Sequence, residues 1–297
     1  MKRDVYQAVT ARIMDALQQG VVPWHKPWDA RQGRPRNLVS GKPYRGMNVW
    51  ILAGQGGSPF WLTYRQAQQI GGHVKQGERG TMVIFWKWLA KQAQADDVGE
   101  ATEETKPRGF AMLRAYTVFN ACQCELPEHW RERAEIKAPE LAEADKIQAA
   151  EQIVAEMPNR PEIVHAGVRA YYQPGPDRVT MPDPERFEAP ALYYSTIFHE
   201  LTHATGHASR LYRATLVDMV AFGDTNYSKE ELVAEMGAAF LCGVTGIENK
   251  TTLDSASYIQ GWLRKLQDDT KLLIGAAAQA QRAADYILGE TAEAAAD

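Results

Sequence analysis

The segment His199-Glu-Leu-Thr-His203 constrains this chain more than any other feature, because it has the form H-E-x-x-H. Apolar and small residues at helical spacing flank it, and Gly206 is typical of a helix end. Side chains four residues apart share one face of a helix, so His199 and His203 can bind one cation. Glu200 can then reach a metal-bound water as a general base. The alternative is a helix with two solvated histidines.

A third protein ligand would distinguish a metal centre from that alternative. A metzincin would have another His six residues after His203, but Ser209 occupies this position. His207 could add a ligand or instead cap the helix and bond at the surface, because Gly206 leaves its direction open. These residues alone leave the third ligand undecided.

A predicted packed helix downstream carries Glu231 and Glu235 one turn apart. Buried carboxylates without partners are costly, so a cation should face them. We expect Glu231 to be the third metal ligand and Glu235 to orient a ligand histidine. The alternative is that Ser228 and Glu231 form a capping box at the start of this helix and that Glu235 points outward.

The three ligands His199, His203 and Glu231 resemble the site of gluzincin metallopeptidases, in which a Glu from a second helix completes the set. Three protein ligands leave a fourth position for water, as in catalytic zinc sites. The resemblance implies hydrolysis of a peptide bond, with Glu200 taking the proton of the water. Tyr194 or Tyr258 could donate to the developing oxyanion, and the sequence does not choose between them.

Charge is distributed unevenly along the 297 residues. Residues 2–91 carry 14 Lys or Arg against four Asp or Glu, whereas residues 92–297 carry 19 against 33. The asymmetry indicates two parts with different partners. No apolar run is long enough to span a membrane, no signal peptide is evident, and three cysteines give no disulfide framework. We therefore expect a cytoplasmic protein.

The element pattern predicts an α+β protein of two domains. A small mixed α/β domain over residues 1–130 precedes a mainly helical, gluzincin-like domain over residues 140–290, with a charge-rich boundary at 128–139. Residues 90–108 read as an exposed loop between two paired strands. The predicted helices are 5–17, 48–53, 63–70 and 140–157, the predicted strands are 81–88 and 113–119, a hairpin spans 168–181, and helices follow over 253–287.

Aromatic and basic residues gather in the first 90 residues, where six of the eight tryptophans lie. A cationic groove with aromatic faces is typical of single-strand binding, in which each stacked base contributes about 1–3 kcal/mol. We therefore favour single-stranded DNA over a basic protein-binding face, although Trp50 and Trp61 are expected to fill core. The predicted DNA-binding residues are Trp24, Trp28, Arg31, Arg34, Arg36, Lys42, Tyr44, Arg45, Lys75 and Arg79.

Both halves resemble one family, the ArdC-type antirestriction proteins of conjugative plasmids, whose N-terminal region is similar to that of TraC-type plasmid primases. Coverage is nearly the whole chain. The N-terminal motifs are Pro23-Trp24-x3-Trp28, Asn37-x3-Gly41-x2-Tyr44-Arg45-Gly46-x-Asn48, Trp61-x-Thr63-Tyr64-x2-Ala67 and Gly71-Gly-x-Val-x2-Gly77-x2-Gly80. The C-terminal motifs are Tyr193-Tyr194-x4-His199-Glu-Leu-x-His203-x2-Gly206-His207-x2-Arg210-Leu211, Glu230-Glu231-Leu-x-Ala-Glu235 and Ser257-Tyr258-Ile-x2-Trp262-Leu.

The resemblance implies a protein that binds incoming single-stranded DNA, and also duplex DNA in some settings, and protects it from host restriction enzymes. It also implies a divalent metal, Zn2+ most naturally and Mn2+ as an alternative. A host restriction enzyme or another protein would be the peptidase substrate. The alternative function is a cytoplasmic zinc metallopeptidase whose basic domain recruits a protein or a DNA-bound substrate.

Overall fold

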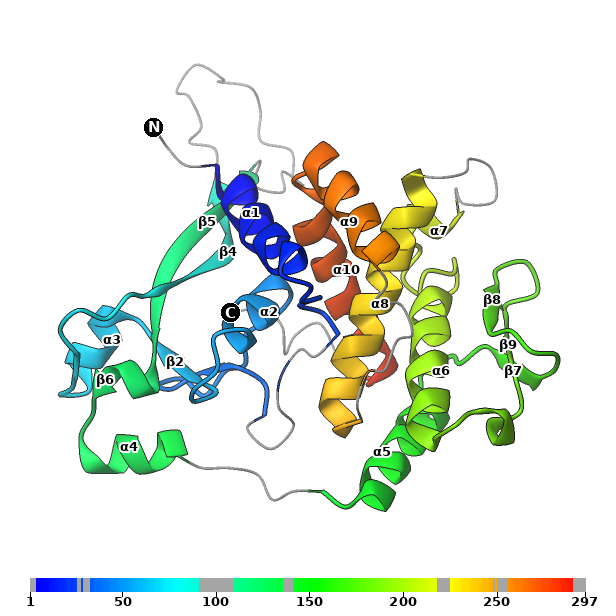
Figure 1. The fold of residues 1–297 in the computed structure, drawn as a ribbon, viewed down its shortest axis with the longest axis horizontal. Coiled ribbons are helices and arrows are strands. Elements are labelled where there is room, and N and C mark those ends of the chain that lie inside the picture. Colours follow the sequence, from blue (N-terminus) through cyan, green and yellow to red (C-terminus); the bar gives the residue numbers. More distant parts are fainter. Residues whose placement is uncertain are drawn as a thin grey trace, which may run out of the picture.

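The computed structural model of the chain describes residues 4–25, 28, 33–90, 109–135, 141–217, 225–247, 249 and 256–290. It is an α+β fold in which a mixed N-terminal domain precedes a mainly helical C-terminal domain, as the sequence predicts (Figure 1). The helices are α1 (Val5–Gln18), α2 (Met47–Ala53), α3 (Tyr64–Gln69), α4 (Glu128–Glu135), α5 (Glu143–Glu156), α6 (Pro190–Ala204), α7 (Ala214–Val217), α8 (Thr225–Thr245), α9 (Ala256–Asp268) and α10 (Leu272–Ile287).

The strands form three small sheets. The N-terminal sheet has the order β1-β2-β5-β4, in which β1 and β2 are parallel and the other pairs are antiparallel. A two-stranded sheet pairs β3 with β6, and a three-stranded sheet in the C-terminal half has the order β7-β9-β8. The strands are β1 (Arg36–Asn37), β2 (Phe60–Leu62), β3 (His73–Val74), β4 (Thr81–Ala90), β5 (Gly109–Asn120), β6 (Cys124–Glu125), β7 (Glu162–His165), β8 (Tyr171–Gln173) and β9 (Arg178–Met181).

Periodicity located most of these elements. The helix predicted over 5–17 is α1, and the two aromatic-rich strands pair along their length as β4 and β5. The hairpin predicted over 168–181 is the antiparallel pair β8 and β9. The exposed loop was predicted over residues 90–108; Ala90 is the last residue of β4, and residues 91–108 lie outside the described residues.

The structure adds to or differs from the expected elements in three places. The charge-rich segment proposed as the domain boundary contains α4, whose charged residues face water while Ala134 packs into a small second core with residues of β2. Strand β7 was not predicted, and it pairs in parallel with β9. Helix α8 begins at Thr225, so Ser228 lies inside the helix and does not cap it.

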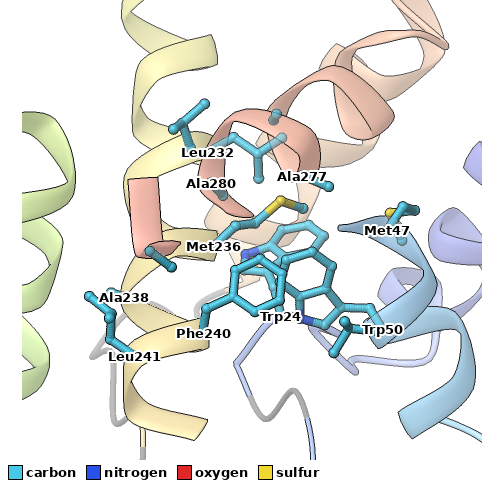
Figure 2. Close-up of a cluster of buried hydrophobic side chains, with 14 of the residues drawn as sticks. Trp24, Met47, Trp50, Leu232, Met236, Ala238, Phe240, Leu241, Ala277 and Ala280 are labelled. Carbon is cyan, nitrogen blue, oxygen red and sulfur yellow. The ribbon is translucent and has the colours of Figure 1, made fainter. Parts of the chain in front are cut away.

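The main hydrophobic core is shared by the two halves. Trp24 and Trp50 from the N-terminal half lie against Phe240 and Met236 of α8, with α10 above them (Figure 2). The ring centroids of Trp50 and Phe240 are 4.5 Å apart. A Cβ at Gly243 of α8 would lie 2.5 Å from Cζ2 of Trp28, so glycine lets this indole rest directly on the helix. Within the part of the chain that the structure describes, no helix combines the length and the apolar character needed to cross a membrane.

Candidate metal centre

Helices α6 and α8 lie side by side and carry the predicted metal ligands (Figure 1). Helix α6 ends at Ala204, just before Gly206, and presents His199 and His203 one turn apart. The two helices approach closely at Gly237 of α8, where a Cβ would lie 2.6 Å from Oγ1 of Thr202. The absence of a side chain at this glycine therefore sets the distance between the elements of the site.

The structure brings His199, His203 and Glu231 together, and their ligand atoms all lie within 4.8 Å of one another. The two Nε2 atoms are 3.1 Å apart, and the Glu231 carboxylate oxygens lie 3.5 Å from His199 Nε2 and 3.4 Å from His203 Nε2. Ligands placed tetrahedrally at about 2.0–2.2 Å from one zinc-like ion would be separated by about 3.3–3.6 Å. The spacing and the donor set both fit a divalent metal.

The electrostatics of the cluster also favour a cation. Burial by itself would lower the pKa of His203, but contacts with Glu230 and Glu231 and the charge of Glu231 raise it to about 10. Burial would raise the pKa of Glu231, whereas His199 and His203 hold it well below its usual range. A proton on His203 thus compensates the carboxylates, and metal binding would displace that proton.

Glu230 is a neighbour of the cluster that sequence reasoning missed. Its carboxylate is fully buried, lies 3.4 Å from Nδ1 of His203 and bonds to the guanidinium of Arg213. These contacts hold the pKa of Glu230 at about 2, although burial alone would raise it. The sequence signal that could have indicated Glu230 is its place next to Glu231. The structure shows that Glu230 is the more buried of the two.

Glu235 has different partners from those expected. Its Oε2 accepts a hydrogen bond of 2.8 Å from Nε1 of Trp24 and another from the hydroxyl of Tyr258. Burial raises the pKa of this carboxyl group. Its role in orienting a ligand histidine stays a prediction; among the described residues, Glu230 is the carboxylate that lies beside Nδ1 of His203.

Glu200 and His207 occupy contrasting positions. Glu200 is only 7% exposed and makes no side-chain hydrogen bond among the described residues, so it is available to act as a base at the cluster. His207 lies beyond the end of α6, and its Nδ1 is 2.8 Å from Oγ of Ser209. His207 is therefore engaged in a turn and is not part of the cluster.

The predicted DNA-stacking residues lie in the core. Trp24, Trp28 and Tyr44 are 1%, 9% and 6% exposed, respectively. A base needs an accessible ring face, so these side chains offer none in this structure. Their burial has a physical reason, since Trp24 satisfies Glu235 and Trp28 packs on α8. Trp50 and Trp61 are buried, as expected for core residues.

The predicted basic DNA contacts divide into two groups. Arg34 donates to Gln281, Arg45 pairs with Asp285, and Arg36 stacks on Phe60, so all three serve packing. Lys42, Lys75 and Arg79 are exposed, and Arg31 lies outside the described residues. The DNA-contacting role of this set stays a prediction.

Two families match the chain. Residues 3–119 match the N-terminal domain of anti-restriction factor ArdC, and residues 147–279 match a zincin-like metallopeptidase family, MPTase-PolyVal. The chain is 35% identical over 305 residues to the uncharacterized protein y4eC of Sinorhizobium fredii (strain NBRC 101917 / NGR234), covering 98% of this chain and 94% of y4eC. It is 34% identical to two DNA primases TraC of Escherichia coli, covering 97% of this chain but only 20% and 27% of the primases.

Solved structures agree over the whole length. The metal-free crystal structure of the antirestriction ArdC protein from the R388 plasmid is 36% identical with a TM-score of 0.73, covering 98% of both chains. Its Mn(II)-bound structure is also 36% identical with a TM-score of 0.72, covering 99% of both chains. The likeness to this protein at 36% identity over 98% of both chains, together with the matched N-terminal domain of anti-restriction factor ArdC, shows that the chain belongs to the ArdC-type antirestriction family.

Proposed function

We propose that this chain is a cytoplasmic antirestriction protein that binds single-stranded DNA without sequence specificity and protects incoming DNA from host restriction enzymes. The observation that carries the proposal is the likeness to the R388 ArdC protein over 98% of both chains. The matched region of TraC supports the DNA-binding part, because the name of that relative is DNA primase. The excess of basic residues in the N-terminal half supplies the charge that phosphates require.

The metal centre would hold one divalent ion through His199, His203 and Glu231. The nitrogen-rich donor set favours Zn2+, and the Mn(II)-bound relative makes Mn2+ the alternative. A bound divalent metal would supply Lewis acidity for hydrolysis. Glu200 would accept a proton from a water in the centre. Glu230 would fix the orientation of the His203 ring through its contact with Nδ1 of that ring.

A plasmid-transfer assay tests the antirestriction proposal. We expect the chain, produced with the entering plasmid, to raise plasmid establishment in a restricting host and to change nothing in an isogenic host without the restriction enzyme. His203→Ala should lose stoichiometric metal, as measured on the purified protein by elemental analysis. Equal establishment with and without the chain in the restricting host would refute the proposal.

The second candidate function is a metallopeptidase whose basic half recruits a protein or a DNA-bound substrate. Glu200 favours it, because this glutamate lies beside the cluster and its carboxylate makes no side-chain hydrogen bond among the described residues, which leaves it open to a water. Glu200→Gln should retain metal and DNA binding under both functions. Loss of protection in this variant would show that hydrolysis is needed, whereas full protection would limit the centre to metal and DNA binding.

A further inference from the structure

Strands β4 and β5 extend beyond the core, which covers the first residues of β4 and the last residues of β5. Val83 and Val118 on one face of this pair are fully buried or nearly so, at 0% and 2% exposure. Further along the same face, Phe85 and Tyr116 are 45% and 43% exposed. Figure 1 shows the two strands running side by side along one flank of the N-terminal domain. Because these rings are nearly half exposed, each forgoes part of the about 1.5–3 kcal/mol that complete burial of a large apolar side chain contributes. Neighbouring exposed rings of this kind indicate a binding surface.

The strand register places these rings beside cations. Phe85 pairs with Arg114, and Tyr116 pairs with Val83, so the three exposed side chains share a face with Lys87. The centroids of the Phe85 and Tyr116 rings are 5.7 Å apart at an interplanar angle of 71°. The buried ring of Tyr44 lies 6.2 Å from Phe85 and supports it from the core side.

The charge of this face is uncompensated in the strands themselves. Neither β4 nor β5 contains an Asp or Glu. Lys87 and Arg114 are exposed, and neither forms an ion pair with any residue of the described ranges. The Phe85 face, which comprises Phe85, Lys87, Arg114 and Tyr116, thus combines half-exposed rings with cations that have no ion-pair partner among the described residues.

We propose that the Phe85 face is the platform on which single-stranded nucleic acid stacks, with bases on Phe85 and Tyr116 and phosphates beside Lys87 and Arg114. The inference rests on the proposed DNA-binding function and assigns the surface on which the DNA would bind. Duplex bases are already stacked and hide their faces, whereas a single strand can turn them toward protein rings. Stacking on rings and contact with phosphates do not depend on the identity of the base, which suits binding without sequence specificity.

The opposite face of the same strands provides a matched control. Trp86 points to that face and is 55% exposed, more than Phe85 or Tyr116. Its cross-strand partner is the apolar Leu113, and neither strand places Lys87 or Arg114 on its side. Removing Trp86 therefore removes an exposed aromatic ring from the same element without touching the cationic platform.

The test is fluorescence anisotropy of a labelled oligo(dT) with the full-length protein. Phe85→Ala and Tyr116→Ala should each weaken binding about tenfold, whereas Trp86→Ala should stay within about twofold. Tyr116→Phe, which keeps the ring, should bind like the wild type. Thermal unfolding of each variant checks the fold, which these exposed positions should leave intact.

The outcomes separate this inference from the proposed function. If the wild-type protein fails to bind oligo(dT) at low salt, the DNA-binding function itself is refuted. If the wild type binds and Phe85→Ala and Tyr116→Ala bind equally well, the function stands and the platform is refuted. Loss of binding in Trp86→Ala alone would move the site to the opposite face and would also overturn the proposal.

Two further arms define the ligand. Arg114→Gln with Lys87→Gln should reduce the slope of log affinity against log salt by about 0.7 for each cation removed. An unchanged slope would contradict phosphate contact at this face. Oligo(rU) compared with oligo(dT) distinguishes RNA from DNA as the source of the strand, and equal weakening of both by Phe85→Ala supports stacking. Affinity for a blunt duplex that depends on Phe85 would contradict a single-strand platform.

Discussion

Arg213, Glu230 and His203 form a line of charged groups that leads from the interior of the C-terminal half to the metal centre. The guanidinium of Arg213 also donates a hydrogen bond of 2.7 Å to the carbonyl oxygen of Thr202 and one of 2.5 Å to Oγ1 of Thr205. It therefore neutralises Glu230 and ties this carboxylate to the end of α6. A carboxylate fixed in this way restricts the ring of His203 and increases its basicity as a ligand.

The single-residue prediction follows from this line. Glu230→Gln should weaken metal binding by about 10–100-fold, because the amide no longer supports His203 as a charged acceptor. Glu235→Gln should have the smaller effect, since the described partners of Glu235 are Trp24 and Tyr258. Titration calorimetry with Mn2+ on both folded variants measures the difference. A greater loss for Glu235→Gln would mean that Glu235, as the sequence predicted, is the orienting carboxylate.

At the scale of elements, the contact between α6 and α8 decides whether the metal ligands meet. Gly237→Ala should destabilise the protein by about 1–3 kcal/mol and weaken metal binding, because its methyl group would force Thr202 and therefore α6 away. Thermal unfolding and metal titration measure the two effects. Thr202→Ala removes the colliding atoms, so the double variant should recover much of both losses.

Gly275→Ala in α10 is the matched control for that experiment. A Cβ at Gly275 meets nothing within 4 Å, so alanine there should raise stability by about 0.5–1 kcal/mol through helix propensity. If Gly237→Ala behaved like Gly275→Ala, close approach of the helices would not be what holds the centre together.

A second pair of elements is joined by Arg210 and Asp177, which connect the β8–β9 turn to the end of α6. The side chain of Arg210 is fully buried, and it also donates 2.7 Å to the carbonyl of Ala204. Burial alone would raise the pKa of Asp177, but hydrogen bonds from Arg210 and Tyr172 lower it below its ordinary value. The carboxylate is therefore more acidic in the folded protein than in the unfolded chain.

This shift predicts a pH-dependent effect of Asp177→Asn. A lowered folded pKa means that the stabilisation is present above the unfolded pKa of about 3.9 and is lost as pH falls through the folded value. The variant should be about 2 kcal/mol less stable at pH 7, and the difference should shrink below about pH 4. Asn tolerates the positive φ of 50° at this position, so the change isolates the charge. A difference that is constant with pH in denaturant titrations would exclude the ion pair as its cause.

At the scale of the whole molecule, one hydrophobic core joins the two halves, which match two different family models. Trp24 donates to Glu235 and packs edge-on against Trp262 with ring centroids 6.0 Å apart. Trp28 rests on α8 at Gly243. The proposed domains, residues 1–130 and 140–290, thus share one hydrophobic core.

We therefore expect the full chain to unfold in one calorimetric transition. Trp28→Ala should lower the free energy of unfolding of the whole chain by about 3–5 kcal/mol. A fragment of residues 140–290 should bind a hydrophobic dye, because it exposes the surface that Trp24 and Trp28 cover. Two resolved transitions in the intact protein would show that the halves fold independently.

The sequence by itself determined the local features of this protein. H-E-x-x-H on a helix, the strands β4 and β5 and the hairpin at β8 depend on spacing between near neighbours, which helical and pleated geometry make periodic. It also indicated Glu231, because a second acidic helix had to face the two histidines. Its prediction of Trp24, Trp28 and Tyr44 as stacking residues could not be checked locally, since an aromatic beside arginine can serve core or surface.

Only the tertiary structure decided which side chains face the metal centre and which face water. Glu230 and Glu231 are adjacent in sequence, and the crossing of α6 over α8 at Gly237 is what turns one toward Nδ1 and the other toward Nε2 of His203. Likewise, the packing of the N-terminal segment on α8 buries Trp24 and leaves Phe85 exposed. These outcomes depend on contacts between residues that are far apart in the sequence. Trp24 and Glu235, for example, are separated by 211 positions, and no local pattern records their contact. Burial is a property of the assembled core, whereas periodicity is a property of the chain.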